Sequence, residues 1–130
     1  MTASPQFRIL VVDDHEFIRR GVCGIFTAET GFDICGEAAN GQQAVEQVKK
    51  LHPHLVILDI SMPVMNGLEA AAEIRRIAPQ TKIIILTMHD SQVMKDQAQK
   101  AGADAYVVKT EIAEHLVRQA RFLLNLMTAD

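Results

Sequence analysis

Five short apolar segments recur along the 130 residues, and they constrain the fold more than any other feature of the sequence. They are FRILVV (7–12), FDICGEA (32–38), LVILD (55–59), KIIILT (82–87) and AYVVK (105–109). Between them, apolar residues repeat with the period of an amphipathic helix, as Ile18, Val22 and Phe26 do. Alternating strands and helices predict a parallel sheet with helices on both faces, because strands buried on both sides are apolar throughout. FDICGEA alternates apolar and polar residues, so it is expected at an edge of the sheet.

Two asparagines mark expected helix starts. Asn40 stands three residues before Gln43, and Asn66 stands three residues before Glu69. This is the spacing of a capping box, in which each side chain hydrogen-bonds to the backbone N–H of the other residue. Helices are therefore predicted to begin near 40 and 66.

The last two helical intervals differ in how firmly they are expected to pack. From about Glu111 an apolar stripe at helical spacing predicts a helix docked on the sheet, with Phe122 off that stripe. The stripe consists of Ile112, Leu116, Ala120, Leu123 and Met127. The segment SQVMKDQAQKA (91–101) has only a thin apolar face, formed by Val93, Met94, Ala98 and Ala101. That helix is expected to be loosely held, which is typical of elements that move in a switch.

Length and composition limit the number of domains, the kinds of partner and the expected location. The length fits one domain that needs no disulfide or structural metal. A net charge of −3 and a pI near 5.9 give no basic surface for nucleic acid, so proteins and small ions are the expected partners. Cys23 and Cys35 lack the spacing of a zinc site and are expected to be reduced. No apolar run approaches the ~20 residues of a membrane span. A cytoplasmic location without membrane contact is expected.

Polar residues follow the apolar segments at their carboxyl ends. Asp13 and Asp14 follow the first, Asp59 ends the third, Thr87 ends the fourth and Lys109 ends the fifth. In a doubly wound five-stranded sheet of order 2-1-3-4-5, the strand order reverses between strands one and three, and ligands bind there. The three carboxylates are then expected to converge on a cation such as Mg²⁺. A helix N-terminus would also explain the acidic pair by itself.

Lysine and threonine beside such a metal point to phosphoryl chemistry. The Lys109 ammonium would neutralise phosphoryl oxygens, and the Thr87 hydroxyl would hydrogen-bond to them. Asp59 stands alone and central, so it is the expected nucleophile, giving an aspartyl phosphate. A strand-end salt bridge would explain Lys109, and a strand terminator would explain Thr87. The occurrence of both at consecutive strand ends favours the phosphoryl site.

These segments together resemble one known family. VVDDHEFIRRG, LVILDISMPVMNGLE, IIILTMHD and GADAYVVKT are similar to the signature of the receiver domain of two-component response regulators, over about Phe7 to Leu126. The resemblance implies the doubly wound, flavodoxin-like fold, with a disordered tail over 1–6 and the receiver domain over 7–127. It is strongest with the NarL/FixJ-type branch, whose members usually carry a LuxR-type helix-turn-helix domain. No such output domain is present in these 130 residues.

The resemblance implies a role for each site residue. Asp59 would accept a phosphoryl group from a histidine of a sensor kinase. Asp14 and Asp59 would ligate Mg²⁺ directly with the backbone carbonyl of Ser61, and Asp13 would act through a water. Lys109 would pair with a phosphoryl oxygen. The protein would catalyse only its own phosphotransfer and slow dephosphorylation, so it would not be an enzyme with a separate substrate.

The resemblance also implies a switch. Thr87 would move onto the phosphoryl group, Tyr106 would turn inward behind it, and the face of the fourth helix, fifth strand and fifth helix would be remodelled. That face is a candidate homodimer interface, and DNA would be reached only through an output domain. Ser61 and His89 flank the path of a hydrolytic water and are expected to set the lifetime of the phosphorylated state.

Besides the variable positions Ser61 and His89, two residues depart from the family's commonest pattern. Thr110 replaces a frequent proline after Lys109, and Met88 is bulkier than the small residue often found after the threonine. Gly67 is expected to supply a special backbone conformation or a close approach. His15 adjoins the acidic pair, but Mg²⁺ disfavours imidazole, so a solvated or helix-capping role is expected.

Four other functions remain as alternatives. A stand-alone receiver in a phosphorelay or acting on a protein target would have the same residues. A Mg²⁺-dependent phosphohydrolase with an aspartyl nucleophile needs an acid where Ser61 stands. A flavodoxin-like cofactor carrier is disfavoured, because the acidic first turn would repel a phosphate. A degenerate receiver acting as a scaffold is disfavoured, because all five key positions are filled.

Overall fold

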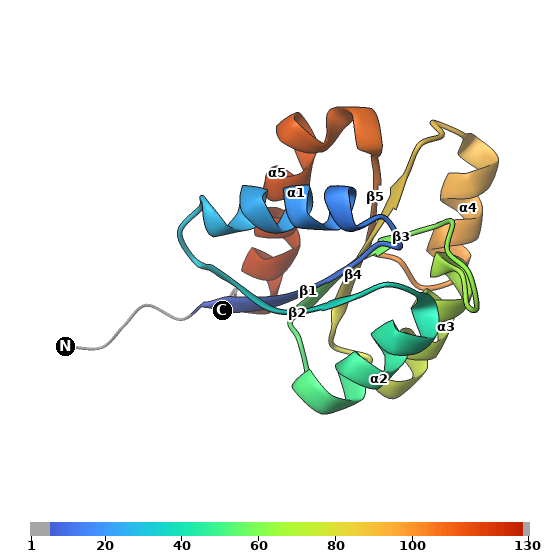
Figure 1. Ribbon diagram of the computed structural model, residues 1–130, viewed down its shortest axis with the longest axis horizontal. Coiled ribbons are helices and arrows are strands. Elements are labelled where there is room, and N and C mark those ends of the chain that lie inside the picture. The colour runs from blue at the N-terminus through green and yellow to red at the C-terminus, as the bar shows by residue number, and fades with distance from the viewer. Residues whose placement is uncertain (1–5, 129–130) are drawn as a thin grey trace.

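The computed structural model describes residues 6–128, with side chains described to residue 125. Five parallel strands form one sheet in the order β2-β1-β3-β4-β5, as predicted (Figure 1). They are β1 (Phe7–Val12), β2 (Phe32–Ala38), β3 (Leu55–Asp59), β4 (Lys82–Thr87) and β5 (Ala105–Val108). The alternating segment β2 lies at an edge. The expected tail lies outside the described residues except for residue 6.

Four α-helices connect the strands, and a fifth follows the last strand. They are α1 (Glu16–Thr27), α2 (Gly41–Leu51), α3 (Gly67–Ile77), α4 (Gln92–Lys100) and α5 (Ile112–Thr128). The fifth strand ends one residue earlier than predicted, because Lys109 begins a short 3-10 helix, η1 (Lys109–Glu111), that leads into α5. Among the described helices, none is both long and apolar enough to cross a membrane.

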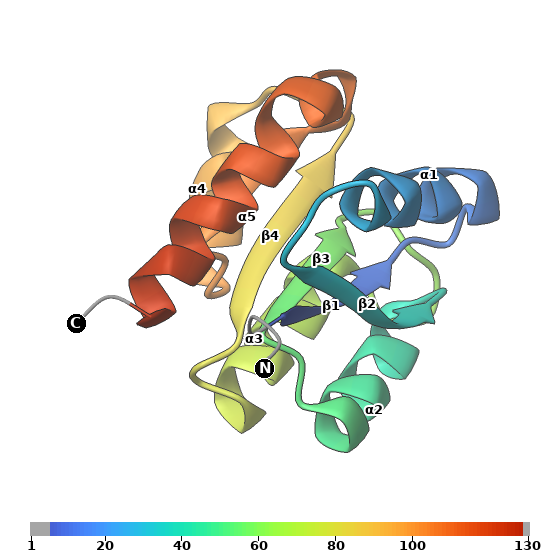
Figure 2. The same cartoon turned by 90° about the vertical axis from the view of Figure 1, so that its left-hand side faces the viewer.

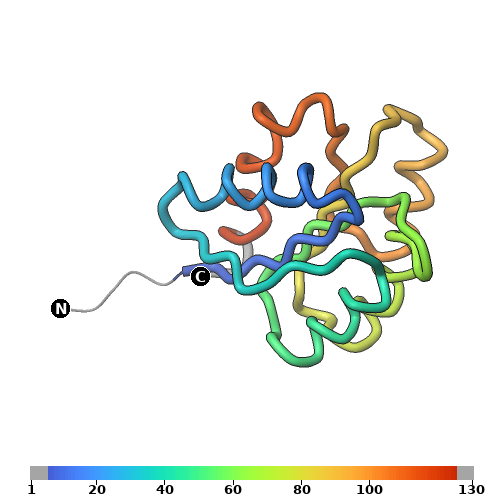
Figure 3. Tube along the Cα trace, in the orientation of Figure 1, coloured from blue at the N-terminus to red at the C-terminus, as the bar shows by residue number. Residues whose placement is uncertain are grey.

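Two hydrophobic cores lie on opposite faces of the sheet. Leu10, Val56 and Ile83 pack with α2, α3 and α4, and their neighbours Ile9 and Ile57 pack with α1 and α5. Figures 1 and 2 show α1 and α5 on one side of the sheet and α2 and α3 on the other. Helices on both faces explain why the central strands are apolar at nearly every position. The loops that follow β1, β3 and β4 gather at one end of the sheet (Figure 3).

The predicted capping box at α3 is present. The Asn66 side chain accepts from the Glu69 backbone N–H at 2.9 Å, and the Glu69 carboxylate accepts from the Asn66 backbone N–H at 3.2 Å. At α2 only half of the box forms. Asn40 accepts from the Gln43 backbone N–H at 2.9 Å, but the Gln43 side chain accepts from the backbone N–H of Ala39 instead.

The last helix packs as predicted over its described side chains. Leu116, Ala120 and Leu123 are buried on the sheet, and Phe122 is 60% exposed. Met127 of the predicted stripe lies outside the described side chains. The prediction for α4 was wrong at one position, because Val93 is 65% exposed and Ala98 is the buried residue of that helix. A face defined by Met94, Ala98 and Ala101 turns Val93 toward solvent.

Candidate functional site

The strand-end acids meet at the carboxyl end of the sheet. Asp13 and Asp59 are 1% and 3% exposed, although they follow two different strands. One ligand atom from each of Asp13, Asp14, His15 and Asp59 lies within 4.8 Å of the others. Register explains the convergence, since Val12 at the end of β1 pairs with Leu58, the residue before Asp59 in β3. The predicted clustering of the three carboxylates is therefore present.

Lys109 neutralises part of this negative charge. Its Nζ atom lies 2.9 Å from Asp13 Oδ2 and 3.0 Å from Asp59 Oδ1, and its side chain is 9% exposed. Burial alone would lower the pKa of Lys109, but the hydrogen bonds and charges of the two carboxylates outweigh it and raise the pKa above its ordinary value. The strand-end salt bridge considered as an alternative is real, and it is made to both buried acids at once.

Asp59 keeps a raised pKa despite its lysine partner. Burial raises it most, the hydrogen bond from Lys109 lowers it, and the negative charge of Asp13 raises it again. One ammonium group is therefore shared between two buried carboxylates. Such a site is short of positive charge.

Asp14 supplies the observation that best fits a cation. Its Oδ1 atom is buried and makes no hydrogen bond. Its nearest ion-pair partner is the ring Nδ1 of His15, at 3.1 Å. A buried carboxylate oxygen without a hydrogen bond is rare, because the loss of its hydration must be compensated. The donor set is made of hard carboxylate oxygens, which suits Mg²⁺.

The loop after β3 approaches the site closely. A Cβ atom on Gly67 would lie 2.3 Å from the carbonyl oxygen of Asp59, so only glycine fits, as the expected close approach requires. Ser61 is exposed at the start of this loop. Val64 has a φ of +68°, an unfavourable backbone conformation for a β-branched residue. No sequence signal marks that strain.

Thr87 is linked to Tyr106 through the backbone of His89. The buried Thr87 hydroxyl accepts from the His89 N–H at 3.1 Å, and the Tyr106 hydroxyl donates to the His89 carbonyl at 2.5 Å. Lys95 of α4 places its ammonium 5.8 Å from the centre of the Tyr106 ring and 3.2 Å from Asp90 Oδ1. Sequence analysis missed Lys95 and Asp90, which no motif distinguishes from other surface charges.

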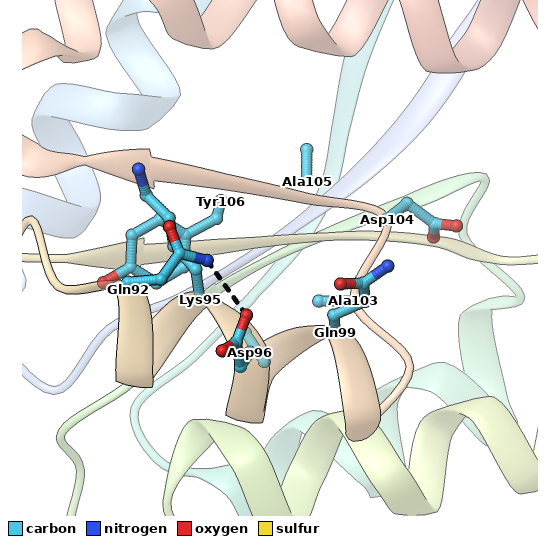
Figure 4. Close-up of a pocket in the computed structure, with 9 residues that line it drawn as sticks. Gln92, Lys95, Asp96, Gln99, Ala103, Asp104, Ala105 and Tyr106 are labelled. Atoms are coloured by element: carbon cyan, nitrogen blue, oxygen red, sulfur yellow. Dashed lines mark hydrogen bonds between the residues drawn. The ribbon is translucent and has the colours of Figure 1, made fainter.

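A pocket of about 340 Å³ adjoins Tyr106 between α4 and β5 (Figure 4). Lys95, Asp96 and Gln99 of α4 line it opposite Ala105 and Tyr106 of β5. It lies on the face whose remodelling the family resemblance implies, and none of the three clustered acids lines it.

The two residues that depart from the family pattern, Met88 and Thr110, lie at the protein surface. Met88 is 62% exposed, and Thr110 is also exposed. No peptide bond among the described residues is cis, so the bond between Lys109 and Thr110 is trans. His15 is the N-cap residue of α1, yet its side chain makes no capping hydrogen bond, so the expected capping role is not observed. The side chain is 68% exposed, and its Nδ1 atom lies near Asp13 and Asp14.

Comparison with known proteins agrees with this geometry. The model of the response regulator receiver domain matches residues 9–121. The chain belongs to this family. Chemotaxis protein CheY of Thermotoga maritima is 45% identical over 102 residues, covering 78% of this chain and 84% of that protein. The receiver fold with strand order 2-1-3-4-5 is thus shown by the structure and by its relatives.

Two solved structures refine the placement within the receiver family. The receiver domain of the response regulator NarL from Mycobacterium tuberculosis is 30% identical with a TM-score of 0.82, covering 91% of this chain and 98% of that one. This similarity supports the NarL/FixJ-like branch. A CheX–CheY–BeF3–Mg²⁺ complex from Borrelia burgdorferi has a TM-score of 0.87 at 27% identity, with coverages of 92% and 90%. The chain spans only about half the length of other curated relatives, at 49% and 54%.

Proposed function

We propose that this receiver is a switch that takes a phosphoryl group from a sensor histidine kinase onto Asp59. The observation that carries the proposal is the buried Asp59 carboxylate, which shares one lysine with Asp13 beside an Asp14 oxygen that makes no hydrogen bond. This arrangement offers a nucleophile, a counter-charge for phosphoryl oxygens and room for a cation.

The transfer itself is a displacement at phosphorus. A lone pair of an Asp59 oxygen forms the new P–O bond, while the P–N bond of the kinase phosphohistidine breaks and the imidazole nitrogen keeps its electron pair. Lys109 is already 3.0 Å from Asp59 and would pair with a phosphoryl oxygen. Asp14, Asp59 and the Ser61 carbonyl, with Asp13 through a water, would hold Mg²⁺, which supplies positive charge against the phosphoryl oxygens.

The switch would use the contacts of His89. The Thr87 hydroxyl, which accepts from the His89 N–H, would donate its own hydrogen to the phosphoryl group as it moves toward Asp59, and Tyr106 would leave the His89 carbonyl to turn inward. Phosphorylation then favours a second arrangement of α4, β5 and α5 by making contacts that only this arrangement allows. Tyr106 and Lys95 couple α4 to that rearrangement. The same face is a candidate homodimer interface.

Two outputs fit the comparisons. Relatives of about twice this length, among them a transcriptional regulatory protein, support control of a DNA-binding domain and of transcription in the cytoplasm. The CheY relative, which the match covers to 84%, supports a stand-alone receiver that acts in a phosphorelay or on a protein target. A phosphohydrolase is disfavoured, because Ser61 offers no acid to a leaving group.

Intact-protein mass spectrometry tests the proposal. The parent and Asp59→Ala are incubated with acetyl phosphate, with Mg²⁺ or with EDTA. The parent should gain one phosphoryl group only with Mg²⁺, and Asp59→Ala should gain none. A parent that binds Mg²⁺ but gains nothing would instead support the scaffold function.

Ser61 and His89 are proposed to set the lifetime of the phosphorylated state. Both are exposed beside the site, where they border the approach of a hydrolytic water. Replacing His89 by alanine keeps its backbone bonds to Thr87 and Tyr106 and removes only the imidazole. The dephosphorylation rate of His89→Ala should differ from that of the parent, and equal rates would remove His89 from this role.

A further inference from the structure

The imidazole of His15 faces the acidic site. Its Nδ1 atom lies 3.1 Å from Asp14 Oδ1 and 3.4 Å from Asp13 Oδ1. The backbone fixes this placement, because the His15 N–H donates to Asp13 Oδ1 at 2.9 Å. As the N-cap residue of α1, His15 could have bonded the first turn of the helix, but its side chain makes no such bond. The ring is turned toward the carboxylates instead.

These separations match two ligands of one metal ion. Nitrogen and oxygen ligands at ~2.1 Å from a metal are ~3.0 Å apart at adjacent octahedral positions and ~3.4 Å apart in a tetrahedron. The two distances from His15 Nδ1 fall within this range. Asp14 Oδ1, the nearer oxygen, is the buried atom without a hydrogen bond. A metal bound between these two atoms would satisfy both.

We propose that His15 is a metal-selecting ligand, which gives the carboxylate site an imidazole-dependent affinity for transition-metal dications such as Co²⁺ and Zn²⁺. Imidazole suits these ions, whereas Mg²⁺ prefers oxygen ligands and water. The inference rests on the proposed acidic site but not on phosphotransfer. Transition-metal dications and Mg²⁺ would then compete for Asp14 and Asp59, and only the former would use His15.

The alternative is a simple ion pair between a charged His15 and its two acidic neighbours. An ion pair requires only positive charge, so it predicts that His15 opposes every metal equally. A metal ligand must offer a nitrogen lone pair, so the proposal predicts that His15 strengthens the binding of transition-metal dications and has little effect on the binding of Mg²⁺. His15 is 68% exposed at its side chain, and its replacement should leave the fold intact.

Calorimetric titrations with Mg²⁺ and Zn²⁺, and the visible absorption of bound Co²⁺, test the proposal. The variants are His15→Ala and Asp14→Asn, with His115→Ala on α5 as the matched histidine control. His15→Ala should weaken Zn²⁺ and Co²⁺ binding about tenfold or more and leave Mg²⁺ binding nearly unchanged. Asp14→Asn should weaken all three ions, and His115→Ala none.

Four results would overturn the inference. In the first, the parent and His15→Ala bind Zn²⁺ with equal affinity, and they also bind Co²⁺ with equal affinity. In the second, His15→Ala gains affinity for Zn²⁺, Co²⁺ and Mg²⁺ by the same factor. Transition-metal binding that survives Asp14→Asn would place the ion elsewhere. Mg²⁺ binding and phosphorylation of Asp59 in the same His15→Ala sample would show that the proposed function stands even if His15 is no ligand. A parent that binds no metal would overturn both.

Discussion

Lys109 Nζ lies 3.0 Å from Asp59 Oδ1, joining the residue after β5 to the last residue of β3. The lysine is also 2.9 Å from Asp13 Oδ2. One ammonium therefore ties together the ends of β1, β3 and β5. The pair is both a structural clamp and the charge that a phosphoryl group on Asp59 would need.

Removal of the lysine charge should destabilise the fold. Lys109→Met leaves the buried Asp13 and Asp59 carboxylates without their shared partner, and breaking a buried pair in this way costs about 3 kcal/mol. The loss should appear as a lower free energy of unfolding in urea with EDTA present. Lys50→Met, on the exposed surface of α2, is the control and should change it by less than about 0.5 kcal/mol. Equal stabilities of the two variants would contradict the clamp.

Asp59→Asn should stabilise the protein at neutral pH. The pKa of Asp59 is raised in the folded state, mainly by burial, so unfolding at neutral pH relieves a costly buried charge. The stability contributed by protonated Asp59 is complete below the ordinary carboxyl pKa and is lost as the pH rises through the raised, folded-state pKa. Thermal unfolding in EDTA should show a higher Tm for Asp59→Asn at pH 7, and the gap should close toward pH 4. A Tm difference between the two proteins that widens as the pH falls would contradict a raised folded-state pKa of Asp59.

Gly67 should tolerate no side chain. A Cβ there would meet the Asp59 carbonyl oxygen at 2.3 Å and the Ile60 Cα at 2.8 Å, both backbone atoms that cannot turn aside. Gly67→Ala should lower the free energy of unfolding by about 3 kcal/mol. Gly24→Ala, in the middle of α1 with nothing within 4 Å of the new Cβ, should raise it by about 1 kcal/mol. Effects of the same sign for both variants would refute the close approach.

Tyr106→Phe should ease the switch. It removes the hydroxyl that donates to the His89 carbonyl, a hydrogen bond that ties the ring to the loop before α4. Loss of about 1 kcal/mol from the resting arrangement should speed phosphorylation by acetyl phosphate about fivefold. Time-resolved intact mass measures the rate, with Phe122→Ala on α5 as an exposed aromatic control. A rate at or below that of the parent would show that this bond does not restrain the switch.

Four of the five strands could be predicted to the residue, and the central ones are clearest because their burial on both faces makes nearly every position apolar. Lys109 was assigned to a strand because it continues an apolar run, yet the backbone turns there into η1. Val93 was misplaced because a thin apolar face on a short helix allows more than one orientation, and Ala98 decides it. Neither error changes which residues form the site, and Lys109 still contacts Asp13 and Asp59 from the start of η1.

The candidate site was predictable where side chains carry the chemistry. Asp13, Asp14, Asp59 and Lys109 converge because the carboxyl ends of parallel strands share one edge of the sheet. The connection between Thr87 and Tyr106 was not predictable in detail, because it passes through the backbone of His89. The strained φ of Val64 likewise depends on the path of the loop and not on residue type.

The central claim is that Asp59 itself carries the phosphoryl group. Borohydride reduces an aspartyl phosphate to homoserine, so reduction after phosphorylation marks the modified residue permanently. Tandem mass spectrometry of the resulting peptides then locates it. The account predicts homoserine at position 59 alone, and only when both acetyl phosphate and Mg²⁺ were present. Homoserine at Asp13 or Asp14, or a phosphorylated protein unmarked at position 59, would contradict it.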